Sequence, residues 1–225
     1  MKLLGPATGL LVLALPAVAG EVSGHAVVTR RLTKKVLSPI VYSLRGTATP
    51  VEARESEPVN EFDRMVVILE GAHAVSKPPA TAVIDQRAAH FDPDLIVVPV
   101  GSTVQFPNSD PIFHNVFSLS KAQPFDLGFY PKGQSRAVKF NRPGIVQVYC
   151  HIHANMYAAI VVTGSPWFAR PAHDGSFSFG NVPAGHYRLV AWHKIAGLHV
   201  VPVDVPAAGA VDVTIRVPVD METRP

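Results

Sequence analysis

The sequence predicts an all-β protein, and three observations support this class. Apolar residues make up 48% of the 225 residues, which is enough for a packed core, while charged residues make up only 16% against ~25% in typical soluble chains. Short Val-rich runs recur along the chain and are interrupted by 21 Pro and 16 Gly, a pattern typical of strands separated by turns. No long stretch has the apolar periodicity of an amphipathic helix.

The first 19 residues have the pattern of a secretion signal. Lys2 supplies a positive charge, residues 10–15 form an apolar core, and residues 17–19 (Ala-Val-Ala) match the small-residue cleavage pattern. We expect cleavage after Ala19, so that Gly20 begins an exported, periplasmic protein. The apolar run is too short for a convincing membrane span, and we expect no membrane span after the signal is removed.

The charge of the chain argues against nucleic acid as a partner. The formal net charge is +3, and it includes Lys2 of the signal. Arg30-Arg31 and Lys34-Lys35 are two short basic pairs that we interpret as solvated positions on a strand or loop. No run of Lys or Arg is long enough to indicate a nucleic-acid-binding arm.

Residues 20–80 are predicted to contribute an N-terminal set of strands and a linker. The polar stretch 47–63, with several Glu and two Pro, is typical of a loop, and Lys77-Pro78-Pro79 marks the linker. The strands of this region are expected at 22–28, 36–44 and 65–69.

Residues 81–165 are predicted to form a β-sandwich with Greek-key connections. Roughly seven or eight short apolar runs alternate here with turn signals, as expected for such a sandwich. The turn signals include 107–111 and 141–144. The strands are expected at 82–84, 95–100, 103–106, 114–117, 136–140, 145–149 and 158–163.

Residues 166–225 are predicted to form the C-terminal part of a second, smaller sandwich. Asp174-Gly175 is typical of a hairpin turn, and strands are expected at 177–179, 187–192, 199–205 and 211–217. About 55 residues without a disulfide rarely fold alone. We therefore expect the strands before Gly71 to complete this sandwich, with the region 81–165 inserted between its two halves.

The chain has one cysteine, Cys150, and its neighbours indicate a metal site. A lone thiol in an exported protein forms no internal disulfide and is an oxidation hazard unless it is buried or bound to metal. Cys150, His153 and Met156 lie within seven residues, and His114 lies upstream on a different predicted strand. Two imidazoles and a thiolate with a weak axial thioether are the ligand set of a blue-copper site. Any one of these residues alone would be a buried thiol, a turn histidine or a core methionine.

Two other chemistries fit this constellation less well. A structural zinc site has no role for the methionine and usually has more than one cysteine. A cysteine hydrolase needs a histidine from elsewhere in the fold and a third residue that orients it, whereas Cys150 and His153 share one tight loop.

The region from about 84 to 162 resembles the cupredoxins, the family of plastocyanin, azurin and amicyanin. The resemblance covers 98–110, His114-Asn115-Val116 and the short C-x2-H-x2-M loop of amicyanin-like members, from Cys150 to Met156. It implies a type 1 copper ion held by His114, Cys150, His153 and Met156. It also implies that His153 lies near the surface among apolar residues, as the port for electrons, and that Asn115 connects the two ligand loops. The sequence departs from the family pattern at His151 and Tyr149, which flank the cysteine.

Two further resemblances concern the flanking regions. The stretch from Phe125 through Cys150 to His193 resembles exported cupredoxin-containing proteins often labelled methylamine-utilisation proteins. The segments at 174–177 and 182–187 resemble carboxypeptidase-regulatory-like or transthyretin-like sandwiches, which implies a scaffold or docking role without catalysis.

Three function classes are compatible with these residues. The first is a one-electron carrier, not an enzyme, that serves an exported redox protein or enzyme. The second is a copper-binding or delivery module without redox cycling, and the third is a copper enzyme subunit with an open coordination position. His193 and His199 flank a short turn and are a minor candidate for a second metal patch, while Trp192 is expected in the core. The sequence does not specify the oligomeric state.

Overall fold

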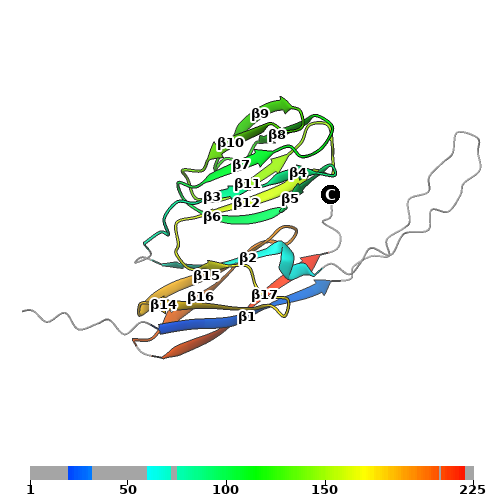
Figure 1. Cartoon of the computed structure of the whole chain (residues 1–225). Helices are drawn as coiled ribbons and strands as arrows, with labels where there is room; N and C mark the ends of the chain where they lie inside the picture. Colours follow the sequence, from blue (N-terminus) through cyan, green and yellow to red (C-terminus); the bar gives the residue numbers. More distant parts are fainter. Residues whose placement is uncertain (1–19, 32–59, 72–74, 208, 221–225) are drawn as a thin grey trace, which may run out of the picture.

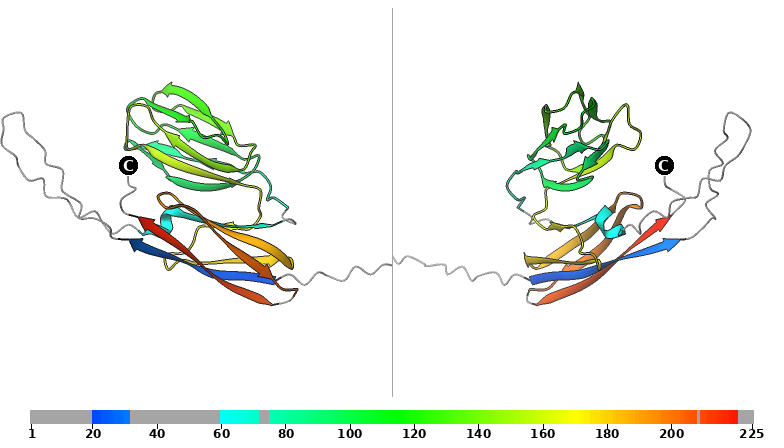
Figure 2. Two further views of the ribbon diagram at one scale, coloured as in Figure 1. Left: turned by 180° about the vertical axis from the view of Figure 1, so that it is seen from behind. Right: turned by 45° about the vertical axis from the view of Figure 1, so that its right-hand side comes forward.

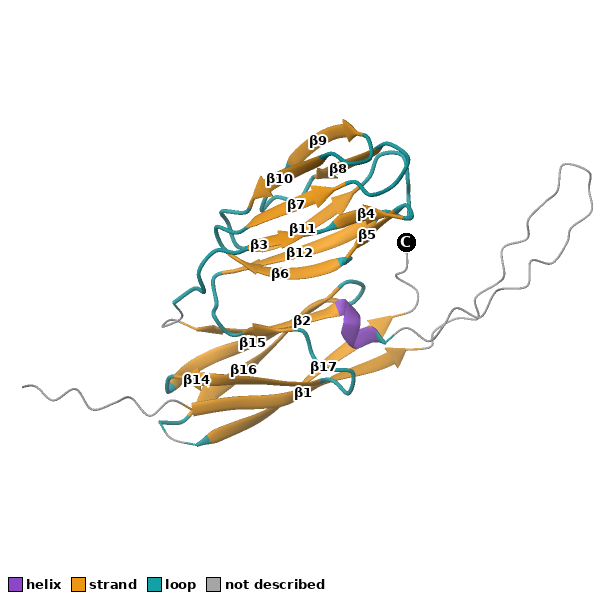
Figure 3. Cartoon of the chain, viewed as in Figure 1, coloured by secondary structure: helices purple, strands orange, loops and turns teal. Residues whose placement is uncertain are grey.

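The protein is built from β-strands joined by turns (Figure 3). The structure, a computed structural model, describes residues 20–31, 60–71, 75–207 and 209–220. Within these ranges the only helical segment is a single 3-10 turn, η1 (Glu61–Arg64), and the predicted all-β class is confirmed. The predicted signal at 1–19 and the predicted strand at 36–44 lie outside the described residues.

The strands form two sandwiches stacked on one another (Figures 1 and 2). The sandwich drawn below in Figure 1 pairs a three-stranded with a four-stranded sheet. The order in the first sheet is β14 (Ser176–Val182), β1 (Gly20–Arg31), β17 (Ala210–Asp220). The order in the second is β13 (Phe168–Ala169), β2 (Met65–Gly71), β15 (Gly185–His193), β16 (Gly197–Val205).

The upper sandwich is formed by the middle of the chain. The order in its five-stranded sheet is β6 (Leu95–Pro99), β12 (Tyr157–Thr163), β11 (Gly144–Tyr149), β8 (His114–Ser118), β9 (Phe125–Tyr130). The order in its three-stranded sheet is β10 (Ser135–Lys139), β7 (Thr103–Pro107), β3 (Thr81–Val83). A short hairpin of β4 (Asp85–Arg87) and β5 (His90–Asp92) lies beside this sheet, where Gln86 forms an isolated bridge to Asn108.

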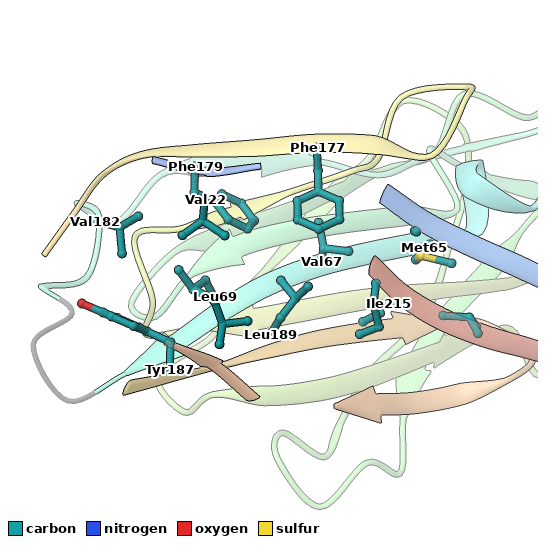
Figure 4. Close-up of a cluster of buried hydrophobic side chains, with 14 of the residues drawn as sticks. Val22, Met65, Val67, Leu69, Phe177, Phe179, Val182, Tyr187, Leu189 and Ile215 are labelled. Carbon is teal, nitrogen blue, oxygen red and sulfur yellow. The ribbon is translucent and has the colours of Figure 1, made fainter. Parts of the chain in front are cut away.

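Strands from the two ends of the chain share the lower sandwich. β1 runs parallel to β17 with Gly24 opposite Val213, and β2 runs antiparallel to β15. At Gly24 the chains approach so closely that a Cβ would collide with the Val213 carbonyl oxygen, so only glycine fits. The hydrophobic core of this sandwich includes Phe177 from β14 and Leu189 from β15, whose side chains point toward each other's sheets in Figure 4.

A second apolar core fills the upper sandwich, and a third lies between the sandwiches. The upper core is lined by residues such as Phe106, Val148 and Ile160. The third core, called the interface core below, joins the sheet that contains β2 and β15 to the sheet that contains β6 and β12. Its buried members are Val66, Ile68, Leu95, Ala159, Val161, Val190 and Trp192. Trp192 is therefore a core residue of the joint between the sandwiches.

The strand predictions missed four strands, β4, β5, β9 and β13. β9 was not expected because its sequence, Phe125-Asp-Leu-Gly-Phe-Tyr130, lacks a clean alternation and contains Gly128 at φ +65°. The β4–β5 hairpin and the two-residue β13 are too short to leave a periodic signal. Among the described residues, no helical segment has the length and apolarity to span a bilayer.

Candidate metal centre

The candidate ligands come from three neighbouring strands of the five-stranded sheet. His114 begins β8, Cys150 directly follows β11, and the loop that carries Cys150 and His153 leads into β12. Tyr149 pairs with Tyr157 across β11 and β12, so this register closes the ligand loop at its base. Adjacent strands of one sheet thus present both ligand segments at the same edge of the upper sandwich.

The donor atoms of His114, Cys150 and His153 converge. The two Nδ1 atoms of the histidines are 3.1 Å apart, and the Cys150 Sγ atom is 3.7 Å from the Nδ1 atom of His153. All three donor atoms lie within 4.8 Å of one another, and no other cluster of three or more His, Cys, Asp or Glu donors occurs in the described part of the chain. His114 and Cys150 are buried and His153 is half-buried, so the group is accessible from one side.

Asp110 sets the orientation of His114. The Asp110 Oδ2 atom lies 2.7 Å from the Nε2 atom of His114, whose side chain is fully buried. A carboxylate at this position holds the proton on Nε2 and leaves the Nδ1 lone pair directed at the centre. This role was not predicted from the sequence, although the i, i+4 spacing of Asp110 and His114 was visible in the motif.

The β4–β5 hairpin supports Asp110 in turn. The backbone N–H groups of Ala88 and Ala89 donate to the two carboxylate oxygens at 2.6 and 2.8 Å. Both alanines have positive φ, 52° and 55°, as a two-residue type I′ hairpin requires, although alanine disfavours that region. Burial opposes ionisation of Asp110, but these N–H groups and His114 outweigh it, and the pKa of Asp110 lies below its ordinary value. The strained turn therefore serves to aim two donors at one carboxylate.

Gln86 and Tyr130 attach the same hairpin to the sandwich. The Gln86 side chain is fully buried and donates from Nε2 to the Tyr130 hydroxyl at 2.7 Å. The Tyr130 hydroxyl donates to the Phe106 carbonyl at 2.8 Å. Desolvation raises the pKa of Tyr130 to about 12, so the phenol stays protonated as the donor. Since Tyr130 pairs with His114 across β9 and β8, these bonds brace the strand start that carries the histidine.

Asn115 reaches the ligand loop only through intermediaries. Its Nδ2 atom donates to Asp126 Oδ1 at 2.7 Å, and Asp126 Oδ2 lies 3.7 Å from the Nε2 atom of His151. The His151 ring stacks on Phe117, with centroids 3.9 Å apart. The N–H of Gly128 and the Asn115 amide hold the pKa of Asp126 below its ordinary value. Asn115 thus binds Asp126, which lies near His151, the residue that departs from the family pattern; the expectation that Asn115 connects the two ligand loops stays a prediction.

Met156 lies at the far end of the ligand loop. Its side chain is fully buried in the same apolar core as Cys150. Its backbone N–H donates to the His153 carbonyl at 3.0 Å, which closes a tight turn between the two residues. Burial of the thioether in the core that also contains Cys150 is compatible with a weak axial ligand.

His193 and His199 each contact backbone groups of the turn that contains Ala196. The Nδ1 atom of His193 accepts the backbone N–H groups of Ile195 and Ala196 at 3.2 and 3.1 Å, and its Nε2 atom lies 3.3 Å from Glu61. The Nε2 atom of His199 pairs with the Ala196 carbonyl at 3.1 Å. Both rings contact nearby protein groups, and neither histidine belongs to a cluster of three or more His, Cys, Asp or Glu donors in the described part of the chain.

Solved structures that are similar to part of this chain include copper proteins. No protein-family model matches it. A copper-containing nitrite reductase from Thermus scotoductus is 27% identical over 42% of this chain, with a TM-score of 0.35, and the match covers only 24% of the reductase. A methionine mutant of amicyanin in its Cu(I) state is 22% identical over 37% of this chain and 82% of its own, with a TM-score of 0.35. A purple cupredoxin from Nitrosopumilus maritimus is 24% identical over 36% of this chain and 99% of its own, with a TM-score of 0.34.

One of these neighbours is named a cupredoxin, and amicyanin belongs to the family that the sequence motif resembles. An enzyme, the nitrite reductase, is among these neighbours. These matches cover less than half of this chain. The resemblance of the lower sandwich to carboxypeptidase-regulatory-like or transthyretin-like domains stays a prediction.

Proposed function

We propose that this protein is an exported type 1 copper protein that carries single electrons between redox partners. The observation that carries the proposal is the convergence of two imidazole nitrogens and one thiol sulfur within 4.8 Å, from His114, Cys150 and His153. Copper bound there would supply a one-electron Cu(I)/Cu(II) couple, with Cys150 and the two histidines as strong ligands and Met156 as the weak one.

The donor chemistry fits copper better than the competing ions. A thiolate and two imidazoles are soft or borderline ligands that magnesium and calcium avoid. Structural zinc sites are closed by four strong ligands, whereas this cluster offers three such groups and a buried methionine. Asp110 holds His114 in the tautomer that leaves its Nδ1 atom free for a metal.

The rigidity of the site favours a carrier. His114 starts a strand, Cys150 follows the end of one, and the Asp110 carboxylate has three hydrogen-bonding partners. A site whose ligands are fixed in advance changes little between two oxidation states, which suits electron transfer.

Exposed apolar side chains precede the candidate histidine ligands in sequence and suit a docking port for a redox partner. Ile112 and Phe113 precede His114, Ile152 precedes His153, and these three side chains are 45%, 56% and 54% exposed. Exposed apolar groups clustered beside a site mark an interaction surface. We infer that an exported redox protein docks here in the periplasm, after removal of the signal at Ala19.

Visible absorption and EPR spectra of the mature protein loaded with Cu(II) test the proposal, with Cys150→Ala as the control. We expect an intense blue band and a narrow copper hyperfine splitting, both lost in the variant. A pale tetragonal spectrum that the substitution leaves unchanged would refute the ligand assignment. Azide binding would indicate an enzyme with an open position, and rapid loss of copper to a chelator would indicate a delivery module.

A further inference from the structure

The ligand loop closes on two tyrosines, and one of them, Tyr157, packs against the interface core between the sandwiches. Tyr149 immediately precedes Cys150 and Tyr157 immediately follows Met156, and their rings are 5.3 Å apart. Side chains alternate along a strand, so Met156 points into the upper core while Tyr157 packs against the interface core on the other face. The two ends of the ligand loop are therefore held together on the face that the lower sandwich covers.

Lys194 of the lower sandwich contacts Tyr157 of this pair. Its Nζ atom lies 4.8 Å from the centroid of the Tyr157 ring and 2.5 Å from the Asp94 Oδ2 atom at the start of β6. Its backbone N–H donates to the Arg64 carbonyl at 3.0 Å, which fixes the end of β15. Only 8% of the Lys194 side chain is exposed.

The Lys194 side chain is largely buried, while 55% of the Asp94 side chain that it binds is exposed. Desolvation lowers the pKa of Lys194, and the Asp94 carboxylate opposes that effect. A cation over an aromatic face gains most when water is excluded, and a charge-assisted bond to a carboxylate is stronger than a neutral one. One ammonium group thus binds, at the same time, the strand that starts at Leu95 and the residue that ends the ligand loop.

We propose that Lys194 is a positioning residue for the ligand loop, so that the lower sandwich restrains the geometry of the metal centre through Tyr157. This inference rests on the proposed function as far as copper is concerned, but the restraint on the loop exists without metal. It assigns the lower sandwich a role in the site beyond that of a scaffold.

The competing explanation is that Lys194 only joins the two sandwiches. Val190 provides the matched control because it belongs to the interface core and lies on β15, the strand that Lys194 directly follows. Val190 lines a groove together with Val161 and Ile145, and neither Tyr149 nor Tyr157 lines that groove. Val190→Ala weakens the joint away from the ligand loop, whereas Lys194→Met removes the ammonium group at the loop itself.

Amide hydrogen exchange of the full, metal-free chain tests the restraint. We expect Lys194→Met to speed exchange in the peptide that covers residues 150–157 by about tenfold, the scale of losing a desolvated cation–π contact and its ion pair. Val190→Ala should leave that peptide unchanged, and Lys194→Arg, which keeps the charge, should restore slow exchange. Unchanged exchange in Lys194→Met, or equal acceleration in Val190→Ala, would overturn the proposal.

A second variant and a second readout keep the test decisive. If Lys194→Met does not fold, Tyr157→Leu removes the ring but leaves the ion pair with Asp94, and it should accelerate the same peptide. With Cu(II) bound, we expect Lys194→Met to change the copper hyperfine splitting while Val190→Ala does not; equal splittings in both variants would contradict a positioning role. A wild-type protein without the blue spectrum would refute the proposed function and leave the exchange result standing.

Discussion

Replacement of Asp110 by Asn should weaken the support of His114. The wild-type carboxylate accepts two backbone N–H groups and lies 2.7 Å from the His114 Nε2 atom. An Asn side chain has one acceptor oxygen, and its amide group would face a second donor. At least one charge-assisted hydrogen bond is lost inside the protein, which costs about 2–3 kcal/mol of unfolding free energy.

The effect should depend on pH in a defined direction. The pKa of Asp110 is depressed below its ordinary value of 3.8 in the folded protein, so its contribution is fully present above that value. The stabilising contribution of Asp110 is lost as pH falls through the folded pKa, because the protonated wild-type carboxyl is then neutral, like the amide of the variant. The difference between wild type and Asp110→Asn should therefore be largest near neutral pH and shrink as pH falls below 3.8.

Urea unfolding of the metal-free protein measures this difference. Asp212→Asn, an exposed substitution on β17, serves as the control and should change stability little. A loss of less than about 0.5 kcal/mol at pH 7, the usual range of surface changes, would refute the assigned role of Asp110. A difference that stays constant down to acid pH would refute the assigned ionisation.

Two further predictions concern the lower sandwich and the joint. Trp192→Ala removes the largest side chain of the interface core and should cost about 3–5 kcal/mol; calorimetry should then resolve two transitions, whereas a single transition at a lower temperature would argue against separable sandwiches. Desolvation lowers the pKa of His193 from its ordinary 6.5, although Glu61 opposes the effect and Arg64 lies nearby. Because the unfolded chain then binds the proton at higher pH, stability should fall as pH drops through 6.5. His193→Gln should reduce that loss in urea midpoints measured on either side of this pH, and an unaltered slope would assign the loss to other groups.

The class of the fold and the candidate ligands could be predicted from local sequence. Short Val-rich runs between Pro and Gly indicate strands because side-chain alternation and turn chemistry act within a few residues. The cluster of Cys150, His153 and Met156 was visible for the same reason, since one loop carries all three. His114 was predicted as a ligand because it lies on a different strand and matches a family motif. The structure places its Nδ1 atom 3.1 Å from that of His153.

Only the tertiary structure decided how these segments are supported. The parallel pairing of β1 with β17 joins the two ends of the chain, and no local pattern encodes which distant strand fits against Gly24. Asp110 gains its role from a hairpin whose two alanines have positive φ. Alanine disfavours that conformation, so the residue type does not indicate the turn. A lysine is ordinarily expected at the surface. Here the stacking of two sheets buries the Lys194 side chain against Tyr157. Sheet packing depends on how the side chains of residues far apart in sequence fit together. The candidate ligands could therefore be found from short motifs, whereas the residues that support them could be found only from the tertiary structure.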